Sequence, residues 1–342
     1  MVTKIGLDLG YAHITLSDVT SGIYREPSIV LVDKDTRRII SVGEAALNVE
    51  SSEGVLVRPF KNGLLFDSQI TKGVIENALS AVNPGDKIRC ILGVPAGFLP
   101  KQEKEIFEML VSSGADECFS VTRSVAAIIG AGYSPSISAV SVNIGAKITE
   151  VTVLYHGKVF SSISENIGGE DFDKAVKQYI LEQGDVNVSL SVARAIKEHL
   201  GAVWSGRDPE AIEIEGTLSL TGNRVKMSIG AEDIVGVFEA PLHTLIRTVA
   251  DSVKRIPSEM VEEIFENGII LTGGAAELYG LDIMMSKVLG IAVTKPDGAI
   301  DCVAKGLSRI NNFIPLRMRS KNKNITQQLA KYYESKKQQN KK

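Results

Sequence analysis

Four glycine-rich turns hold the residues whose type and spacing could do chemistry. Three of them follow strand patterns, at Gly10 in "LDLGYAHITLSDV", at Gly145 in "VNIGAKITEV" and at 273–274 in "LTGGAAEL", and the fourth, "NIGGEDFD" at 166–173, precedes a helix pattern. Glycine in such a turn lets backbone amides approach an anion, and a following helix start adds positive partial charge. Together the four turns predict phosphate binding, although none has the P-loop lysine or the dinucleotide fingerprint.

The first two turns form an internal repeat with different charges. Aligning Gly10 with Gly145 places Asp8 opposite Asn143, and only the second turn contains a lysine, Lys147. Each copy opens a region in which strand patterns are followed by helix patterns. We therefore expect duplicated α/β domains.

The elements that must position these turns can be read from periodicity. Residues 2–18 predict an antiparallel hairpin, and "PSIVLVD", "RRIISVG" and "IRCILGVPAG" predict further strands. The stretch "KQEKEIFEMLVSSGA" predicts a helix that buries Ile106, Phe107, Leu110 and Val111 and ends at Gly114. The pattern then predicts helices at "SVAAIIGAGY", about 170–184, 190–200, 231–254 and 257–266 and from about Ile300, a second hairpin region from Ala139, a β-rich insertion at "IEIEGTLSLTGNRVKMSIG" and a strand at "GIIL".

Composition bounds the class of protein. The 342 residues, with 44% hydrophobic and 23% charged residues, are typical of a globular protein of two domains. No apolar run approaches the roughly 18 residues of a membrane span, and "MVTKIGLDLG" lacks the layout of a signal peptide. Three widely separated cysteines in apolar settings predict buried free thiols. We expect a cytoplasmic protein.

The C-terminal end is strongly basic. Residues 317–342 contain nine Lys or Arg and one acid, a local charge of +8, so that the preceding residues carry about −11. This composition predicts a mobile or loosely helical tail. A solvated end and a contact with an anionic membrane or an acidic partner both stay open, and no specific nucleic acid is predicted.

The order and amino-acid sequences of several motifs resemble the actin superfamily, and most closely bacterial actins of the MreB and MamK type. The resemblance covers roughly residues 4–310 and is carried by "EPSIVLVD", "SVGEAA", "VRPFKNGLLFD", "AAIIGAGY", "NIGGEDFD", "ILTGGAAEL" and "CVAKGL". It implies an α/β, actin-like (duplicated RNase H-like) fold of two domains with mixed sheets flanked by helices. It also implies ATP or ADP in the cleft between the domains and assembly into homopolymer protofilaments.

The resemblance also implies domain boundaries. Domain I would comprise residues 1–140 and about 300–320, with a small subdomain at about 28–70. Domain II would comprise 141–299, with a small subdomain at about 180–248, and 318–342 would be the basic tail.

Site residues carry over onto the matching motif positions. The implied nucleotide-binding set is Asp8, Gly10, Tyr11, Ala12, Asn143, Gly145, Ala146, Lys147, Gly168, Gly169, Glu170, Lys197, Glu198, Gly273, Gly274 and Ala275. Asp8 would lie near a Mg²⁺ ion through its waters. Lys197 and Glu198 of "RAIKEHL" would contact the ribose and base.

Three departures from the family pattern concern hydrolysis. Asn143 replaces the aspartate of the second loop, Lys147 replaces a glycine, and Arg123 replaces the glutamate that positions the attacking water. Hydrolysis needs an oriented in-line water and cations over the phosphates, and a guanidinium cannot accept a proton. We expect a nucleotide binder that hydrolyses slowly or not at all and needs Mg²⁺ less than its relatives do.

Several alternatives stay open. Lys147 and Arg123 could fill the cleft by pairing with Asp8 or Glu170, so that no nucleotide binds. The chain could be a pseudo-ATPase that co-polymerises with or regulates an active bacterial actin paralogue. It could also be an active ATPase or phosphotransferase of the superfamily, although a kinase needs a carboxylate base near its acceptor hydroxyl. Cell shape, motility and organelle positioning are not separated by the sequence.

Overall fold

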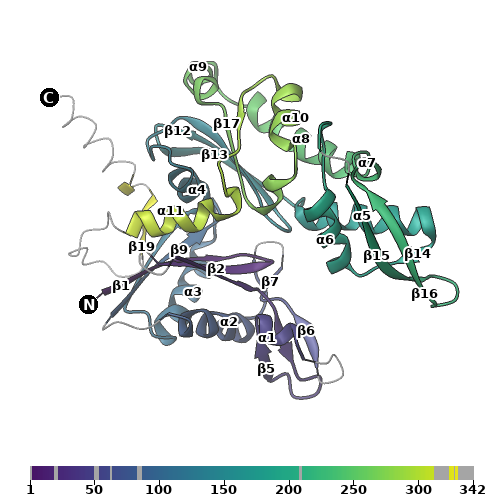
Figure 1. Cartoon of the computed structure of the whole chain (residues 1–342). Coiled ribbons are helices and arrows are strands. Elements are labelled where there is room, and N and C mark those ends of the chain that lie inside the picture. The colour runs from purple at the N-terminus through teal and green to yellow at the C-terminus, as the bar shows by residue number, and fades with distance from the viewer. Residues whose placement is uncertain are drawn as a thin grey trace. The chain divides into compact units, whose positions relative to one another are not determined.

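The computed structural model divides the chain into two compact units (Figure 1). It describes residues 2–18, 22–49, 54–61, 64–82, 87–207, 210–311, 323–326 and 328–329. Unit 1 contains the described residues of Met1–Ser141, Thr152–Ile163 and Asp301–Lys342, and unit 2 contains those of Val142–Val151 and Ser164–Ile300. Most of the predicted basic tail lies outside the described residues.

Unit 1 is built on a mixed six-stranded sheet in the order β19-β10-β9-β1-β2-β3. Its strands are β1 (Val2–Leu9), β2 (His13–Asp18), β3 (Gly22–Pro27), β9 (Lys87–Val94), β10 (Glu117–Thr122) and β19 (Lys323–Asn324). β1, β2 and β3 are antiparallel neighbours, whereas β9 is parallel to β1 and β10 is parallel to β9. The hairpin predicted for residues 2–18 is confirmed.

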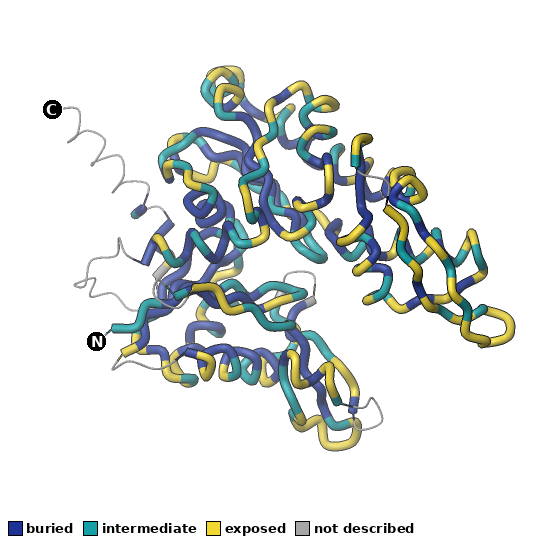
Figure 2. Tube along the Cα trace, in the orientation of Figure 1, coloured by how far each residue is buried: buried dark blue, intermediate teal, exposed yellow. Residues whose placement is uncertain are grey.

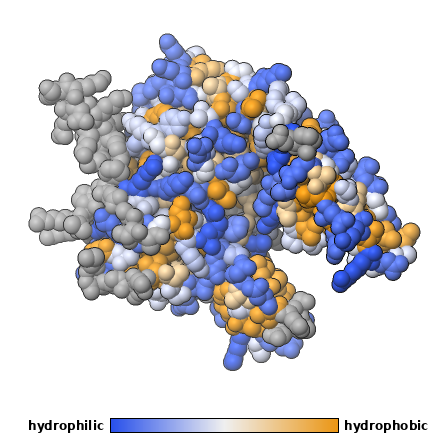
Figure 3. Space-filling model, in the orientation of Figure 1, coloured by the Kyte–Doolittle hydropathy of each residue, from blue (hydrophilic) through white to orange (hydrophobic). Residues whose placement is uncertain are grey.

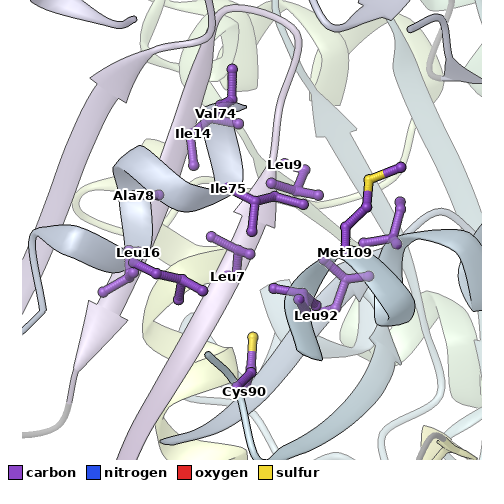
Figure 4. Close-up of a cluster of buried hydrophobic side chains, with 14 of the residues drawn as sticks. Leu7, Leu9, Ile14, Leu16, Val74, Ile75, Ala78, Cys90, Leu92 and Met109 are labelled. Carbon is purple, nitrogen blue, oxygen red and sulfur yellow. The ribbon is translucent and has the colours of Figure 1, made fainter. Parts of the chain in front are cut away.

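The core of unit 1 lies between this sheet and two helices, α2 (Ser68–Ser80) and α3 (Pro100–Ser112). Figure 4 shows Leu7, Val74, Ile75, Leu92 and Met109 in this cluster. The face predicted for α3 is partly wrong, because Val111 is 48% exposed and Met109 is buried instead. These two residues flank the centre of the apolar stripe on opposite sides, so the neighbouring elements decide which one is covered.

Helices α4 (Arg123–Gly130) and α11 (Cys302–Asn311) pack closely within unit 1. A Cβ atom on Gly130 would lie 1.7 Å from the Cys302 carbonyl oxygen, and one on Gly306 would lie 1.8 Å from that of Ala126. The glycines of "AAIIGAGY" and "CVAKGL" therefore permit backbone contact between the two helices.

A smaller part of unit 1 carries exposed apolar side chains. It consists of β4 (Val30–Val32), β5 (Ile39–Val42), β6 (Val55–Val57), the pair β7 (Phe60–Lys61) and β8 (Leu64–Leu65), and α1 (Glu44–Leu47). Ile40, Leu47, Val55 and Leu56 are all more than 40% exposed. Orange atoms gather over this part in Figure 3.

A five-stranded sheet in the order β13-β12-β11-β17-β18 is divided between the two units. The strands are β11 (Ala139–Ile144), β12 (Thr149–Tyr155), β13 (Lys158–Glu165), β17 (Ile269–Thr272) and β18 (Val293–Thr294), and the division between the units crosses the first three. The turn at His156 and Gly157 has positive φ at both residues, which suits a tight hairpin.

The helices of unit 2 are α5 (Gly169–Gly184), α6 (Leu190–Leu200), α7 (Ala231–Ile234), α8 (Glu239–Lys254), α9 (Ser258–Asn267) and α10 (Leu281–Leu289), with short 3-10 turns η1 (Gly274–Glu277) and η2 (Ala299–Asp301). The single helix predicted for 231–254 is wrong. It is two helices, because the chain breaks at 235–238, where Gly236 disfavours a helix and Phe238 is fully buried.

The predicted β-rich insertion forms the hairpin of β15 (Ala211–Leu218) and β16 (Arg224–Gly230), and β14 (Val186–Asn187) pairs with β15 to complete a three-stranded sheet. Yellow alternates with teal along β15 and β16 in Figure 2, as expected of a polar sheet with one covered face.

The remaining sequence predictions concern thiols and membrane spans. Cys90, Cys118 and Cys302 are buried and outside disulfides, as predicted, and burial raises the pKa of Cys118 to about 12. Within the described ranges, no helix has both the length and the apolar character that crossing a membrane requires.

Candidate functional site

The two repeated turns close in the same way. In unit 1, the Gly10 amide donates to the His13 carbonyl at 3.0 Å, and in unit 2 the Gly145 amide donates to the Ile148 carbonyl at 2.9 Å. A Cβ on either glycine would lie 3.0 Å or less from the accepting oxygen. The turn thus leaves no room for a side chain at Gly10 and little room at Gly145, and the internal repeat extends to backbone hydrogen bonding.

Asp8, at the end of β1, is paired with Arg123, the first residue of α4. The Arg123 Nε atom donates to Asp8 Oδ1 at 2.8 Å, and Nη2 donates to the Leu9 carbonyl at 2.9 Å. Both side chains are about four-fifths covered. Because a cation at a helix N-terminus opposes the helix dipole, the Asp8 carboxylate offsets an otherwise unfavourable position for Arg123.

The rest of the first turn is attached to the smaller part of unit 1. Arg58 Nη1 donates to the carbonyls of Tyr11 and Ser28, and the Arg58 guanidinium lies 4.9 Å from the centre of the Tyr11 ring. The Ser28 amide donates to the Ala12 carbonyl at 2.8 Å. These contacts hold Tyr11 and Ala12 in place and give Tyr11 a packing role.

In unit 2, the start of α5 lies directly against the second turn. The amides of Gly169 and Glu170 donate to the carbonyls of Gly145 and Ala146, and the Gly168 amide donates to Asp171. A Cβ on Gly168 would lie 2.7 Å from Ala146 and Lys147 backbone atoms. The first amides of α5 are therefore already satisfied within the protein, and the glycines of "NIGGEDFD" allow this close approach.

Lys147 forms an ion pair with Glu170, at 3.1 Å between Nζ and Oε1, and Lys174 contacts the same oxygen at 3.2 Å. Burial alone would raise the pKa of Glu170, but the hydrogen bonds from the two lysines outweigh burial and lower it. Glu170 is thus held as a carboxylate, and Lys147 is held over the second turn.

Lys197 belongs to a second, deeper ion cluster. Its Nζ atom lies 2.6 Å from Asp173 Oδ1 and donates to the Gly169 carbonyl, while Arg194 Nε donates to Asp173 Oδ2. Asp173 is fully buried, and a buried carboxylate needs such partners. Ala275 is close, because a Cβ on Gly169 would lie 3.3 Å from Lys197 Nζ and 3.5 Å from the Ala275 Cβ.

Glu198 lies elsewhere on α6. Together with Val192, Ile196 and His199 and residues 212–215 of β15, it lines a groove of about 680 Å³. Successive helical residues differ by about 100° in direction, so the structure separates Glu198 from Lys197. The assignment of Glu198 to the nucleotide stays a prediction.

Asn143 and the glycine pair at 273–274 come together in unit 2. Gly273 has a positive φ of 92°, and a Cβ there would lie 2.3 Å from the Ile144 carbonyl oxygen and 2.7 Å from Asn143 Oδ1. Gly274 lies beside the Ile300 side chain. Unit 2 thus gathers the second turn, the start of α5, Lys197 and residues 273–275 into one region.

Sequence reasoning missed three charged residues of this region, Asp173, Lys174 and Arg194. The spacing contained a signal, since Glu170 and Lys174 are four apart and Arg194 and Lys197 are three apart on their helices. With Lys147, Lys197, Glu170 and Asp171, these groups carry one positive charge in excess. In the described part of the chain, no three His, Cys, Asp or Glu side chains gather as a metal site would require.

Comparison with known proteins gives the family. The model described as "MreB/Mbl protein" matches residues 2–317. The cell shape-determining protein Mbl of Bacillus cereus is 30% identical over 312 residues, which cover 88% of this chain and 93% of that protein.

Two solved structures share the fold. The structure of MreB5 of Spiroplasma citri bound to ADP has a TM-score of 0.85 at 20% identity, covering 92% of this chain and 97% of that one. The MamK double helical filament has a TM-score of 0.78 at 20% identity, covering 92% of this chain and 100% of that one. The predicted two-domain, actin-like fold is confirmed, and the chain belongs to the MreB/Mbl family of bacterial actin-like cytoskeletal proteins.

Proposed function

We propose that this chain is a filament-forming cytoskeletal protein that binds ATP and ADP but hydrolyses ATP slowly or not at all, with less need for Mg²⁺ than its relatives. Supporting comparisons are the relative named as cell shape-determining, the neighbour solved as a filament and the neighbour solved with ADP. The process served would be cell shape, motility or organelle positioning, and the location cytoplasmic, with membrane association through residues 317–342.

The observation that carries the proposal is the contact of Arg123 with Asp8. Asp8 is the carboxylate that the family resemblance places near the metal, and Arg123 stands where that resemblance places the water-positioning glutamate. The Arg123 guanidinium neutralises the charge of the Asp8 carboxylate, and it cannot accept the proton of an attacking water. The arginine at position 123 therefore replaces a proton acceptor with a fixed cation.

Unit 2 supports binding of a polyanion. Lys147 is fixed by Glu170, and the surrounding group of charged side chains has one positive charge in excess. The residues inferred for nucleotide binding at 273–275 lie in the same region of unit 2 as Lys197. A fixed cation beside a phosphate can replace part of the charge that a metal supplies.

Self-association is supported by the exposed apolar residues Ile40, Leu47, Val55 and Leu56 in the smaller part of unit 1 (Figure 3). Grouped apolar residues on a protein surface are typical of contact with another protein. We propose the homopolymer as the principal assembly and co-polymers with bacterial actin paralogues as a second one.

Calorimetric titration with ATP and with ADP, in Mg²⁺ and in EDTA, tests the binding part. We expect similar affinities in both conditions. A single-turnover assay should show little cleavage of ATP, and rapid Mg²⁺-dependent cleavage would contradict the proposal. Electron microscopy of the pure protein with ATP, with ADP and without nucleotide tests filament formation.

A second candidate function is a pseudo-ATPase that assembles only with an active paralogue. It is favoured by the pairing of both unusual cations within the protein, Arg123 with Asp8 and Lys147 with Glu170, which leaves neither dependent on a nucleotide. Absence of heat on titration, together with filaments only after mixing with an active paralogue, would support it. An active phosphotransferase is disfavoured by the arginine at position 123.

A further inference from the structure

Residues beyond the range matched by the family model extend the sheet of unit 1. β19 pairs in parallel with the edge of β10, Lys323 opposite Phe119 and Asn324 opposite Ser120. The Ile325 amide then donates to the Ser120 carbonyl at 2.9 Å. Ile325 and Leu329 are 2% and 5% exposed. We call residues 323–326 and 328–329 the C-terminal strap.

The strap ends its pairing at the junction between β10 and α4. Thr326 Oγ1 accepts a hydrogen bond from the Thr122 amide at 3.0 Å and lies 3.1 Å from Thr122 Oγ1. The Thr326 amide donates to Asn324 Oδ1, which orients the residue. Both threonines are buried, so water cannot readily replace these bonds.

Thr122 is also the N-cap residue of α4. Its backbone is extended, with φ −60° and ψ 130°, but its side chain makes no capping hydrogen bond. A threonine at this position ordinarily accepts from an amide in the first turn of the helix. A hydroxyl can donate and accept at once, but the Thr122 oxygen lies beside Thr326 and caps no amide, so it would have to move from this position to cap α4.

The next residue is Arg123, whose side chain holds Asp8 and the Leu9 carbonyl. Because Arg123 is the first residue of α4, its side-chain position depends on the backbone that Thr122 fixes. We propose that the C-terminal strap regulates the Asp8–Arg123 pair, with Thr326 as the positioning residue. Docking of the strap holds Arg123 on Asp8. Release of the strap lets Thr122 cap α4 and loosens the pair, which makes Asp8 available to a metal.

The consequence for Mg²⁺ rests on the proposed nucleotide binding, whereas the effect on Arg123 does not. The test uses the full chain with Thr326→Val, which removes the acceptor while keeping the shape, and Thr326→Ser, which restores the hydroxyl. Thr221→Val, at an exposed turn of unit 2, is the matched control. Asn324→Ala, at an exposed position, is a milder change that removes the acceptor of the Thr326 amide.

Two readouts separate positioning from mere stability. By NMR, solvent exchange of the Arg123 Nε–H should accelerate about five- to tenfold in Thr326→Val, in line with loss of one buried hydrogen bond. The ratio of ATP affinities with and without Mg²⁺ should rise by a similar factor. Thr326→Ser and the control should match the parent, and Asn324→Ala should change both readouts in the same direction by less.

The outcomes are distinguishable. If Thr326→Val accelerates exchange of the Thr122 amide but leaves the Arg123 Nε–H unchanged, the strap is only structural and the proposal is overturned. If Thr326→Val does not fold, unchanged Arg123 exchange in folded Asn324→Ala overturns it equally. If no variant binds ATP while Arg123 exchange accelerates, the nucleotide proposal fails and the regulation of the pair stands.

Discussion

The turn at Gly10 in unit 1 and the turn at Gly145 in unit 2 have the same backbone closure but opposite charge arrangements. In the first, the hairpin supplies the acid, Asp8, and helix α4 supplies the cation, Arg123. In the second, the turn supplies the cation, Lys147, and helix α5 supplies the acid, Glu170. The two copies therefore share their backbone geometry but differ in which element supplies the acid and which supplies the cation. Each introduced cation has a carboxylate partner, as a partly buried charge requires.

The depth of the supporting charges also differs between the two copies. The second turn rests on α5, whose Gly169 carbonyl accepts from Lys197, and Lys197 is fixed by the fully buried Asp173. The first turn is held by Arg58 and Arg123, and the Arg123–Asp8 pair is only partly buried. Unit 2 should therefore lose more stability than unit 1 when a single carboxylate is neutralised.

The largest effect is expected from Asp173→Asn. It leaves Arg194 and Lys197 facing a site without charge, which should lower the free energy of unfolding of unit 2 by about 3 kcal/mol. Urea titration followed by fluorescence of Trp204, the single tryptophan of the chain and part of unit 2, measures it. Glu182→Gln, at the exposed face of α5, is the control. An equal loss in both variants would mean that the buried ion cluster is not the cause of the effect.

Gly130→Ala should have the next largest effect and should act on unit 1. The added methyl group would overlap the Cys302 carbonyl and push apart α4 and α11, at a cost of about 2–3 kcal/mol. Hydrogen exchange of α4 amides reports the loss locally. Gly236→Ala, where nothing lies within 4 Å, should change little, and a similar effect in both variants would count against close packing as the cause.

Arg123→Gln tests whether the first turn affects ATP binding through the Mg²⁺ ion. The change releases Asp8, so the ratio of ATP affinity in Mg²⁺ to that in EDTA should rise about tenfold, which corresponds to one charge-assisted hydrogen bond. Calorimetry in the two buffers measures the ratio. An unchanged ratio would mean that Asp8 does not meet the metal.

Lys147→Gln tests whether the second turn acts directly on phosphate. Loss of its charge should weaken ATP binding about fivefold in Mg²⁺ and in EDTA alike, because the ammonium would contact the polyanion itself. The same titrations apply. If Lys147→Gln weakened ATP binding in only one of the two buffers, the second turn would act through the metal as the first turn does. The predicted difference between the two turns would then be wrong.

The smallest effect is the pH dependence of Glu170. Because its pKa is lowered in the folded chain, its contribution to stability is present above the unfolded pKa of about 4.3 and is lost as pH falls through the folded value. Glu170→Gln should therefore destabilise by about 1 kcal/mol at pH 7 and by less below about pH 4. Urea titrations at both pH values check this, and a constant difference would contradict it.

Much of the local structure was predictable because its causes are local. The hairpins at 2–18 and 139–155 follow from alternating apolar residues around a glycine turn, and the β-rich insertion follows from the same signal. The sequence predictions were wrong where packing against neighbouring elements decides which residues are buried. Val111 and Met109 flank one apolar stripe, and 231–254 reads as continuous helix until Phe238 is buried.

The candidate site was predictable as a set of positions but not as a set of contacts. The sequence named Asp8 and Glu170 as possible partners of Arg123 and Lys147 without deciding which carboxylate meets which cation. It named no ion-pair partner for Lys197 and treated Lys197 and Glu198 as one pair. The structure directs these two neighbours to different sides of α6. It also reveals Asp173, whose importance follows from its complete burial.

The sequence by itself determined the family, the duplicated hairpins, the loss of two carboxylates at Asn143 and Arg123 and the gain of two cations at Arg123 and Lys147, because these are properties of residue type and order. Tertiary structure alone decided which carboxylate meets which cation. Asp8 and Arg123 are 115 residues apart, and Thr122 and Thr326 are 204 apart. Only the pairing of strands and the packing of helices bring such groups within hydrogen-bonding distance, and an electrostatic contact of this kind depends on distance and burial rather than on position in the chain.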